Sequence, residues 1–253
     1  MKKMIAAILA GCVSLALFSG CAKKSDALVV GVDDQFAPMG FRDENNNLVG
    51  FDIDLAKAVG EKMGRKVEIQ AINWNNKISE LNGGSVDLIW NGFTITDERK
   101  EKVLFTKPYL ANEQILVVKA DNTSIKSIND LEGKKVVLQA DSTALEAFEK
   151  TEVSKKVKPT QVKDNVTALM EIKNGTSDAI VIDSVVADYY MKKDPDTYKK
   201  VGDALAPEEY GVGVKLGNTE LLDELQKAMD ECIADGTAAK ISQEWFGEDK
   251  LLK

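Results

Sequence analysis

The sequence predicts an α/β protein built from two similar units with largely parallel sheets. The first supporting observation is that short apolar runs, typical of buried strands, alternate with segments whose apolar residues recur at helical spacing. The second is an internal repeat, in which residues 81–89 (LNGGSVDLI) resemble residues 172–180 (IKNGTSDAI). Each copy has the pattern of a helix end, a glycine turn, and an aspartate that leads into a buried strand. We therefore expect two comparable lobes.

The individual elements follow in order along the chain. Strands are expected at residues 28–32, 67–71, 86–90, 115–118, 136–138 and 179–182. Helices are expected around residues 51–63, 78–81, 144–148, 166–170 and 221–233. Gly64 stands where the first helix should receive its C-terminal cap. Cys232 falls on the apolar stripe of the last of these helices, so we interpret it as a small core residue.

The first twenty residues predict an export signal that is not part of the fold. Lys2 and Lys3 precede an apolar run at residues 4–18, which is shorter than the roughly 18 residues needed to span a bilayer. Small residues before Cys21 resemble the lipobox of bacterial lipoproteins. Cys21 is therefore expected to be lipidated, with residues 21–27 as a tether at a membrane surface. A simple cleaved signal and an uncleaved anchor are the alternatives.

The composition excludes several classes of function. The chain has no histidine, which removes Ser-His-Asp and Cys-His catalysis and histidine-ligated zinc. Its formal net charge of −8 argues against a nucleic-acid partner, because such binding depends on basic patches. Without residues 1–20 the chain keeps only two cysteines, Cys21 and Cys232, so lipidation of Cys21 leaves no pair for a disulfide. We expect neither a metal nor a cofactor.

Ordered motifs run along almost the whole of the remaining chain. They are GVDDQFAPM at 31–39, GFDIDLA at 50–56, NGFTITDER at 91–99, FTKPY at 105–109 and YGVGV at 210–214, with agreeing segments at 136–143, 179–183 and 236–246. Together they resemble the polar amino-acid solute-binding proteins of bacterial ABC importers. The resemblance implies a periplasmic-binding-protein clamshell with two crossover hinge strands. Lobe 1 would comprise residues 28–110 and 208–253, and lobe 2 residues 111–207.

A buried zwitterionic amino acid requires a partner for each of its two charges. Arg99 can present a bidentate fork to a carboxylate, and the resemblance assigns it to the ligand carboxylate. The alternative is a surface arginine in a helix capped by Thr96. Asp183 follows a buried strand and should lie at the carboxyl edge of its sheet, where the resemblance assigns it to the ligand ammonium. Capping the helix that begins near Val185 is its alternative role.

The resemblance adds further residues around these two charges. Thr94 would offer its hydroxyl to the ligand carboxylate and Gly92 a backbone group to the ammonium, with Asn91 beside them. Ser142 and Thr143 begin the helix at 144–148, whose N-terminus can donate amide hydrogens to the same carboxylate.

Aromatic residues are expected to flank the ligand side chain. Phe36 and Trp74 match positions with this role in the family, although lone aromatic residues in α/β chains are more often part of the core. Asp33 would face the distal end of the ligand and favour an amide or a cation there. Asp141 departs from the family, which usually has glycine or threonine at this point.

The predicted function is capture of a polar L-amino acid and its delivery to the transmembrane permease subunits of an ABC transporter. We expect a monomeric binding protein that is not an enzyme and that is held by its lipid anchor at the outer face of the cytoplasmic membrane, or is periplasmic. The alternatives are a ligand-sensing receptor module and a periplasmic cyclohexadienyl-type dehydratase, which would have to move protons with Asp or Glu. Arginine, lysine, glutamine and cystine all remain candidate ligands.

Overall fold

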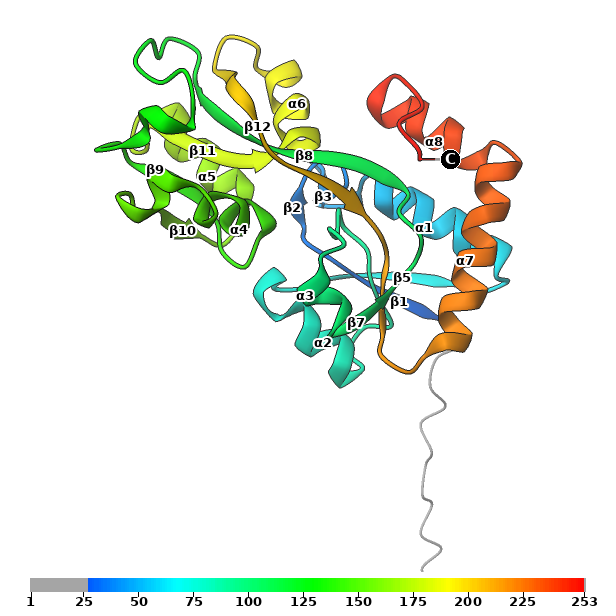
Figure 1. Cartoon of the computed structure of the whole chain (residues 1–253). Coiled ribbons are helices and arrows are strands. Elements are labelled where there is room, and N and C mark those ends of the chain that lie inside the picture. Colours follow the sequence, from blue (N-terminus) through cyan, green and yellow to red (C-terminus); the bar gives the residue numbers. More distant parts are fainter. Residues whose placement is uncertain (1–26, 253) are drawn as a thin grey trace, which may run out of the picture.

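The computed structural model describes residues 27–252, which form two α/β lobes joined by a pair of long strands (Figure 1). The predicted signal segment, Cys21 and the tether up to residue 26 lie outside this part of the chain. Between residues 27 and 252, no helix has both the length and the apolar character required to cross a membrane. The predicted two-lobed α/β architecture is confirmed.

Lobe 1 is built on a five-stranded sheet with the strand order β5-β1-β6-β13-β7. Its strands are β1 (Leu28–Val32), β5 (Val67–Ala71), β6 (Leu88–Ile89), β7 (Val103–Phe105) and β13 (Gly213–Lys215). Its helices are α1 (Phe51–Lys62), α2 (Lys77–Gly83), α3 (Asp97–Lys100), α7 (Thr219–Ala234) and α8 (Thr237–Phe246), with a 3-10 turn η1 (Trp74–Asn76). A small antiparallel sheet of β2 (Gln35–Phe36), β3 (Gly40–Arg42) and β4 (Leu48–Val49) is attached to it.

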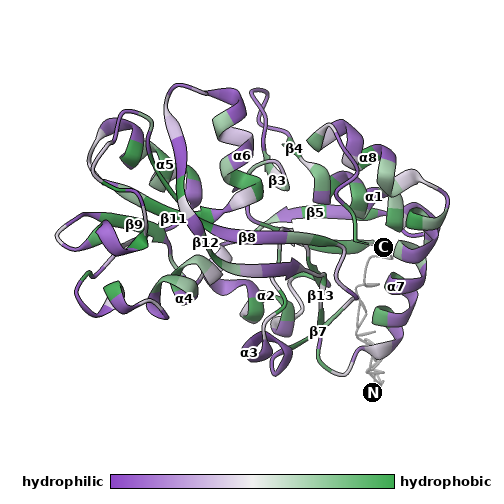
Figure 2. Cartoon of the chain, turned by 45° about the horizontal axis from the view of Figure 1, so that its top comes forward, coloured by the Kyte–Doolittle hydropathy of each residue, from purple (hydrophilic) through white to green (hydrophobic). Residues whose placement is uncertain are grey.

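Lobe 2 is built on a second five-stranded sheet with the strand order β10-β9-β11-β8-β12. Its strands are β8 (Leu110–Lys119), β9 (Val136–Gln139), β10 (Thr160–Val162), β11 (Ala179–Asp183) and β12 (Tyr198–Tyr210). Its helices are α4 (Thr143–Glu149), α5 (Asn165–Asn174) and α6 (Ser184–Lys193), with 3-10 turns η2 (Ile128–Leu131) and η3 (Glu152–Lys155). In Figure 2, strands β9 and β11 are largely hydrophobic, whereas α3 presents a hydrophilic surface.

The internal repeat corresponds to the same construction in both lobes. Helices α2 and α5 each end at a glycine in the left-handed region, Gly84 at φ 79° and Gly175 at φ 72°. The aspartate that follows each turn then accepts a hydrogen bond from the backbone at or next to the neighbouring strand. Asp87 Oδ2 accepts the backbone N–H of Val29 at 2.9 Å, and Asp178 Oδ2 accepts that of Lys135 at 2.8 Å.

Strands β8 and β12 form the connection between the lobes (Figure 1). They pair antiparallel from Lys119 and Tyr198 at one end to Leu110 and Tyr210 at the other, with a register shift between Val201 and Ala206. The prediction of largely parallel sheets is only partly correct. In each sheet four strands run in one direction and one, β13 or β8, runs the opposite way, so two of the four strand pairings are parallel and two antiparallel. The predicted lobe boundaries fall on the two hinge strands and remain a prediction.

Candidate functional site

Arg99 lies buried near the hinge, on the side of lobe 1. Thr96 caps the short helix α3 by accepting the Arg99 backbone N–H at 3.1 Å. The arginine side chain nevertheless turns inward and is only 8% exposed, so it is not the surface residue of the alternative interpretation. Arg99 Nη1 donates to the Thr94 carbonyl at 3.0 Å, and the guanidinium carbon lies 4.8 Å from the centroid of the Phe93 ring.

Asp183 lies at the carboxyl end of β11, on the side of lobe 2, as predicted. It occupies the N-cap position of α6, but its carboxylate makes no capping hydrogen bond. Instead Asp183 Oδ1 accepts Asn112 Nδ2 at 2.8 Å and the Tyr210 hydroxyl at 2.6 Å. Burial, reinforced by the charge of Glu208, raises the pKa of Asp183 to about 7.

A continuous chain of hydrogen bonds leads from Arg99 to Asp183 through the hinge. Arg99 binds the carbonyl of Thr94, and the Thr94 hydroxyl donates to Glu208 Oε2 at 3.0 Å. Asn112 Nδ2 donates to the same Glu208 oxygen at 2.9 Å as well as to Asp183. The guanidinium and the buried carboxylates of Asp183 and Glu208 therefore belong to one polar network.

The hinge residues of this network were not among the predicted site residues. Asn112 and Gln114 occupy alternate positions of β8, and Glu208 and Tyr210 occupy alternate positions of β12. Residues two apart in a strand face the same side, and all four are buried. The available signal in β8 was a polar run, Asn112 to Gln114, directly before an apolar one, whereas β12 is mostly polar along its length and gave no such signal.

Gly92 approaches the site with its backbone in a conformation that favours glycine. Its φ is +54°, and a Cβ added there would lie 2.7 Å from Phe36 Cε1. The Gly92 N–H donates to Asp52 Oδ2 at 2.7 Å, and the Tyr109 hydroxyl donates to Asp52 Oδ1 at 2.8 Å. Burial raises the pKa of Asp52 to about 7. A ligand ammonium only donates hydrogen bonds, so the group of Gly92 that could accept one is its carbonyl.

Asn91 precedes this glycine and is almost completely buried at 1% exposure. Within residues 27–252, neither polar atom of its side chain has a hydrogen-bond partner. Asp52, which holds the adjacent Gly92, was another residue that sequence reasoning missed.

The N-terminus of α4, in lobe 2, lies next to Thr94 of lobe 1. The Ser142 hydroxyl accepts the Leu145 N–H at 3.2 Å and donates to the Gln139 carbonyl at 2.7 Å, which confirms that Ser142 begins this helix. The hydroxyl oxygens of Thr143 and Thr94 lie 3.4 Å apart, so the two lobes meet here.

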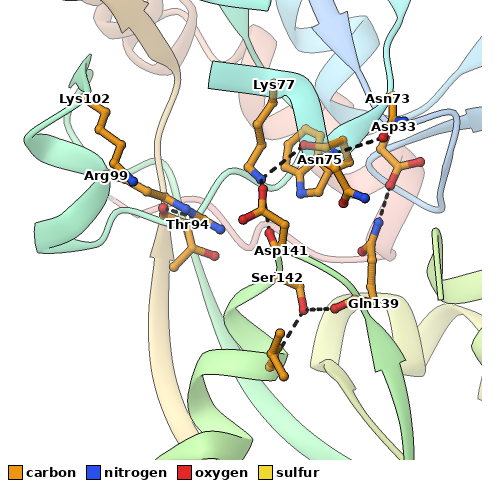
Figure 3. A network of polar contacts seen from close by, with 12 residues as sticks. Asp33, Asn73, Asn75, Lys77, Thr94, Arg99, Lys102, Gln139, Asp141 and Ser142 are labelled. Atoms are coloured by element: carbon orange, nitrogen blue, oxygen red, sulfur yellow. Dashed lines mark hydrogen bonds and ion pairs between the residues drawn. The ribbon is translucent and has the colours of Figure 1, made fainter. Parts of the chain in front are cut away.

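Phe36 and Trp74 are both buried in this structure, at 7% and 8% exposure. The Trp74 ring packs edge-on against Phe93, with ring centroids 5.9 Å apart. Asp33 Oδ2 accepts Gln139 Nε2 of lobe 2 at 2.8 Å (Figure 3). Burial raises the pKa of Asp33 to about 6.

A cavity of about 760 Å³ opens beside the hinge. It reaches Thr94, Thr143 and Glu208 and extends outward between α3 and α4. This volume falls within the range of roughly 300–1,000 Å³ that is common for small-molecule sites. Arg99 and Asp183 do not line this cavity themselves but belong to the network at its inner end.

Residues 28–248 match the family of bacterial extracellular solute-binding proteins, family 3. The chain belongs to this family. A match over this range includes both lobes and both hinge strands, so it covers every residue of the site described above.

Individual relatives in the family have similar lengths and known ligands. The L-cystine-binding protein TcyJ of Escherichia coli K12 is 31% identical over 228 residues, covering 90% of this chain and 85% of its own. The arginine-binding extracellular protein ArtP of Bacillus subtilis 168 is 32% identical over 263 residues, covering 99% and 100%. An ancestral arginine-binding protein, solved with bound glutamine, superposes with a TM-score of 0.83 at 45% identity, covering 88% and 99%.

Proposed function

We propose that this chain captures a polar L-amino acid between its lobes and delivers it to the transmembrane subunits of an ABC importer. The observation that carries the proposal is one hydrogen-bonded network that contains a buried guanidinium, Arg99, and two buried carboxylates, Asp183 and Glu208. A zwitterion placed among them would have a cation for its carboxylate and anions for its ammonium.

The two charged groups come from different lobes, which gives the ligand a way to favour closure. Arg99 belongs to α3 of lobe 1 and Asp183 to β11 of lobe 2. A ligand that contacts both binds the closed state better than the open one and shifts the population accordingly. A relative that binds cystine and others that bind arginine or glutamine support an amino acid as the ligand. Asp33 would select an amide or a cation at the distal end.

Two further parts of the proposal concern location and chemistry. Lipidation of Cys21 would hold the protein at the outer face of the cytoplasmic membrane. The protein would bind its ligand without catalysing a reaction, because the ligand ammonium accounts for the buried carboxylates and no proton transfer by them is required. Metabolic labelling with a fatty-acid analogue tests the anchor, because Cys21→Ser should abolish the label and leave ligand binding unchanged. Label retained on the serine variant would refute the anchor.

A thermal-shift panel of the twenty amino acids, cystine and ornithine tests the function. A ligand at 100 times its dissociation constant should stabilise the protein by about 2.7 kcal/mol. Arg99→Ala should abolish the shift for every amino acid. Lys102→Ala is the matched control, because Lys102 is an exposed cation just beyond the same helix and does not line the cavity. A full shift retained by Arg99→Ala would remove Arg99 from the carboxylate role, and no shift for any compound would refute the function.

A further inference from the structure

Lys77 is a buried lysine whose ammonium joins the two lobes. The residue begins α2 of lobe 1 and is only 2% exposed. Lys77 Nζ donates to the Trp74 carbonyl of its own lobe at 3.2 Å. Across the cleft it donates to the Asp141 carbonyl at 3.1 Å and to Asp141 Oδ2 at 2.5 Å (Figure 3).

These contacts use the full hydrogen-bonding capacity of the ammonium. A lysine ammonium has three N–H donors, and the three acceptors around Lys77 take all of them. No donor is left for a ligand in this arrangement. The Trp74 ring, whose centroid lies 5.1 Å from Nζ, covers the ammonium on another side. The Lys77 ammonium therefore connects lobe 1 to lobe 2 and does not contact a ligand.

Its partner is held in an unusual backbone conformation directly before the site. Asp141 has a φ of +53°, a region that non-glycine residues adopt infrequently. It immediately precedes Ser142, which caps α4. By binding both the carbonyl and the carboxylate of Asp141, Lys77 fixes the approach of the α4 N-terminus to lobe 1. Separation of the lobes would remove two of the three acceptors of Lys77.

We propose that Lys77 and Asp141 form an interlobe clasp that stabilises the closed state without contacting the ligand. This inference rests on the proposed function for its consequence, that ligand affinity depends on the clasp. Lys77 is thus a positioning residue, which acts through the approach of the lobes. Burial, reinforced by the charge of Arg99, lowers the pKa of Lys77, and the pairing with Asp141 opposes this shift.

The test combines affinity with a direct measure of closure. Lys77→Met, which removes both interlobe hydrogen bonds, should weaken binding of every bound amino acid by about tenfold. Asp141→Asn, which keeps the Asp141 carbonyl as an acceptor, should weaken it less, and neither variant should change the order of preference. The double variant should be no weaker than Lys77→Met alone, because Lys77→Met already removes every contact that Asp141→Asn weakens. Asp141→Asn keeps the test decisive if the buried Lys77→Met variant misfolds, because the Asp141 side chain is 58% exposed and its replacement should leave the fold intact. Lys62→Met, which breaks a 2.5 Å ion pair with Asp235 inside lobe 1, is the control.

Interlobe distances between spin labels at Glu61→Cys of α1 and Asn174→Cys of α5 provide the second measurement. Without ligand, the clasp variants should show fewer closed molecules than the wild-type protein or Lys62→Met. Unchanged distances, or loss of only some amino acids from the binding profile, would refute the clasp. If no amino acid binds the wild-type protein but the distances change as expected, the proposed function fails and the clasp stands.

Discussion

Asp183 and Glu208 accept hydrogen bonds from the same nitrogen atom, Asn112 Nδ2, at 2.8 and 2.9 Å. Both carboxylates are buried, and they come from different strands of one sheet. Among residues 27–252, neither carboxylate forms a salt bridge with a cationic side chain, and the donor they share is neutral. A ligand ammonium would supply a compensating charge, so the ligand-free site should bind a cation more readily than a single carboxylate would.

The first prediction concerns the pH dependence of binding. Asp183 must be ionised to accept an ammonium, and its pKa is raised to about 7. Affinity should therefore fall as the pH decreases below about 7, approaching tenfold for each further pH unit. Glu208→Gln removes the neighbouring charge and should move this decline to lower pH. Titration calorimetry between pH 5 and pH 8 measures it, with Glu44→Gln, an exposed residue that does not line the cavity, as control. A pH-independent affinity in the wild-type protein would remove Asp183 from the ammonium role.

The second prediction concerns the stability of the ligand-free protein. Burial raises the pKa of Asp52 and Asp183 to about 7 and that of Asp33 to about 6, above the ordinary value of 3.8. The folded state therefore binds protons that the unfolded state has released, and the contribution of these groups to stability decreases as the pH rises from the unfolded pKa of 3.8 to the folded values of about 6 and about 7. Each contributes up to about 1.4 kcal/mol per pH unit. Urea unfolding at several pH values should show a flatter slope for Asp52→Asn, and an unchanged slope would contradict the prediction.

The third prediction concerns Gly92. Its positive φ and the 2.7 Å approach of an added Cβ to Phe36 leave no room for a side chain. Gly92→Ala should lower the free energy of unfolding by about 1–3 kcal/mol and weaken ligand binding as the loop shifts. Gly84→Ala, which also has positive φ but no atom within 4 Å of an added Cβ, is the matched control. Chemical denaturation and thermal shift measure both effects, and equal binding by the two variants would argue against close packing at Gly92.

The fourth prediction separates the aromatic wall from the charged end of the site. Trp74→Ala should weaken binding because the ring next to the ligand side chain is lost, yet the requirement for an α-ammonium should persist. Titration with each amino acid and its des-amino analogue measures both properties. Unfolding of the ligand-free variant shows whether the fold is retained. If the analogues bound as well as the parent compounds, Asp183 would not be the ammonium partner.

Much of the architecture was predictable because it depends on local pattern. The glycine turns and following aspartates of the internal repeat indicated two similar lobes, and both copies brace a neighbouring strand in the same way. The caps at Thr96 and Ser142 and the burial of Cys232 also follow from short-range sequence. The chain belongs to the family indicated by the ordered motifs.

The sequence by itself determined which residue types could bind a zwitterion and that histidine chemistry was absent. Only the tertiary structure decided which charges share an environment. Glu208 lies close to Asp183 because β12 and β11, which carry them, pair with the two sides of β8, a strand much earlier in the chain. Lys77 contacts Asp141 because the two lobes approach each other. Such contacts depend on how separate elements pack, and the spacing of residues along one chain does not encode that directly.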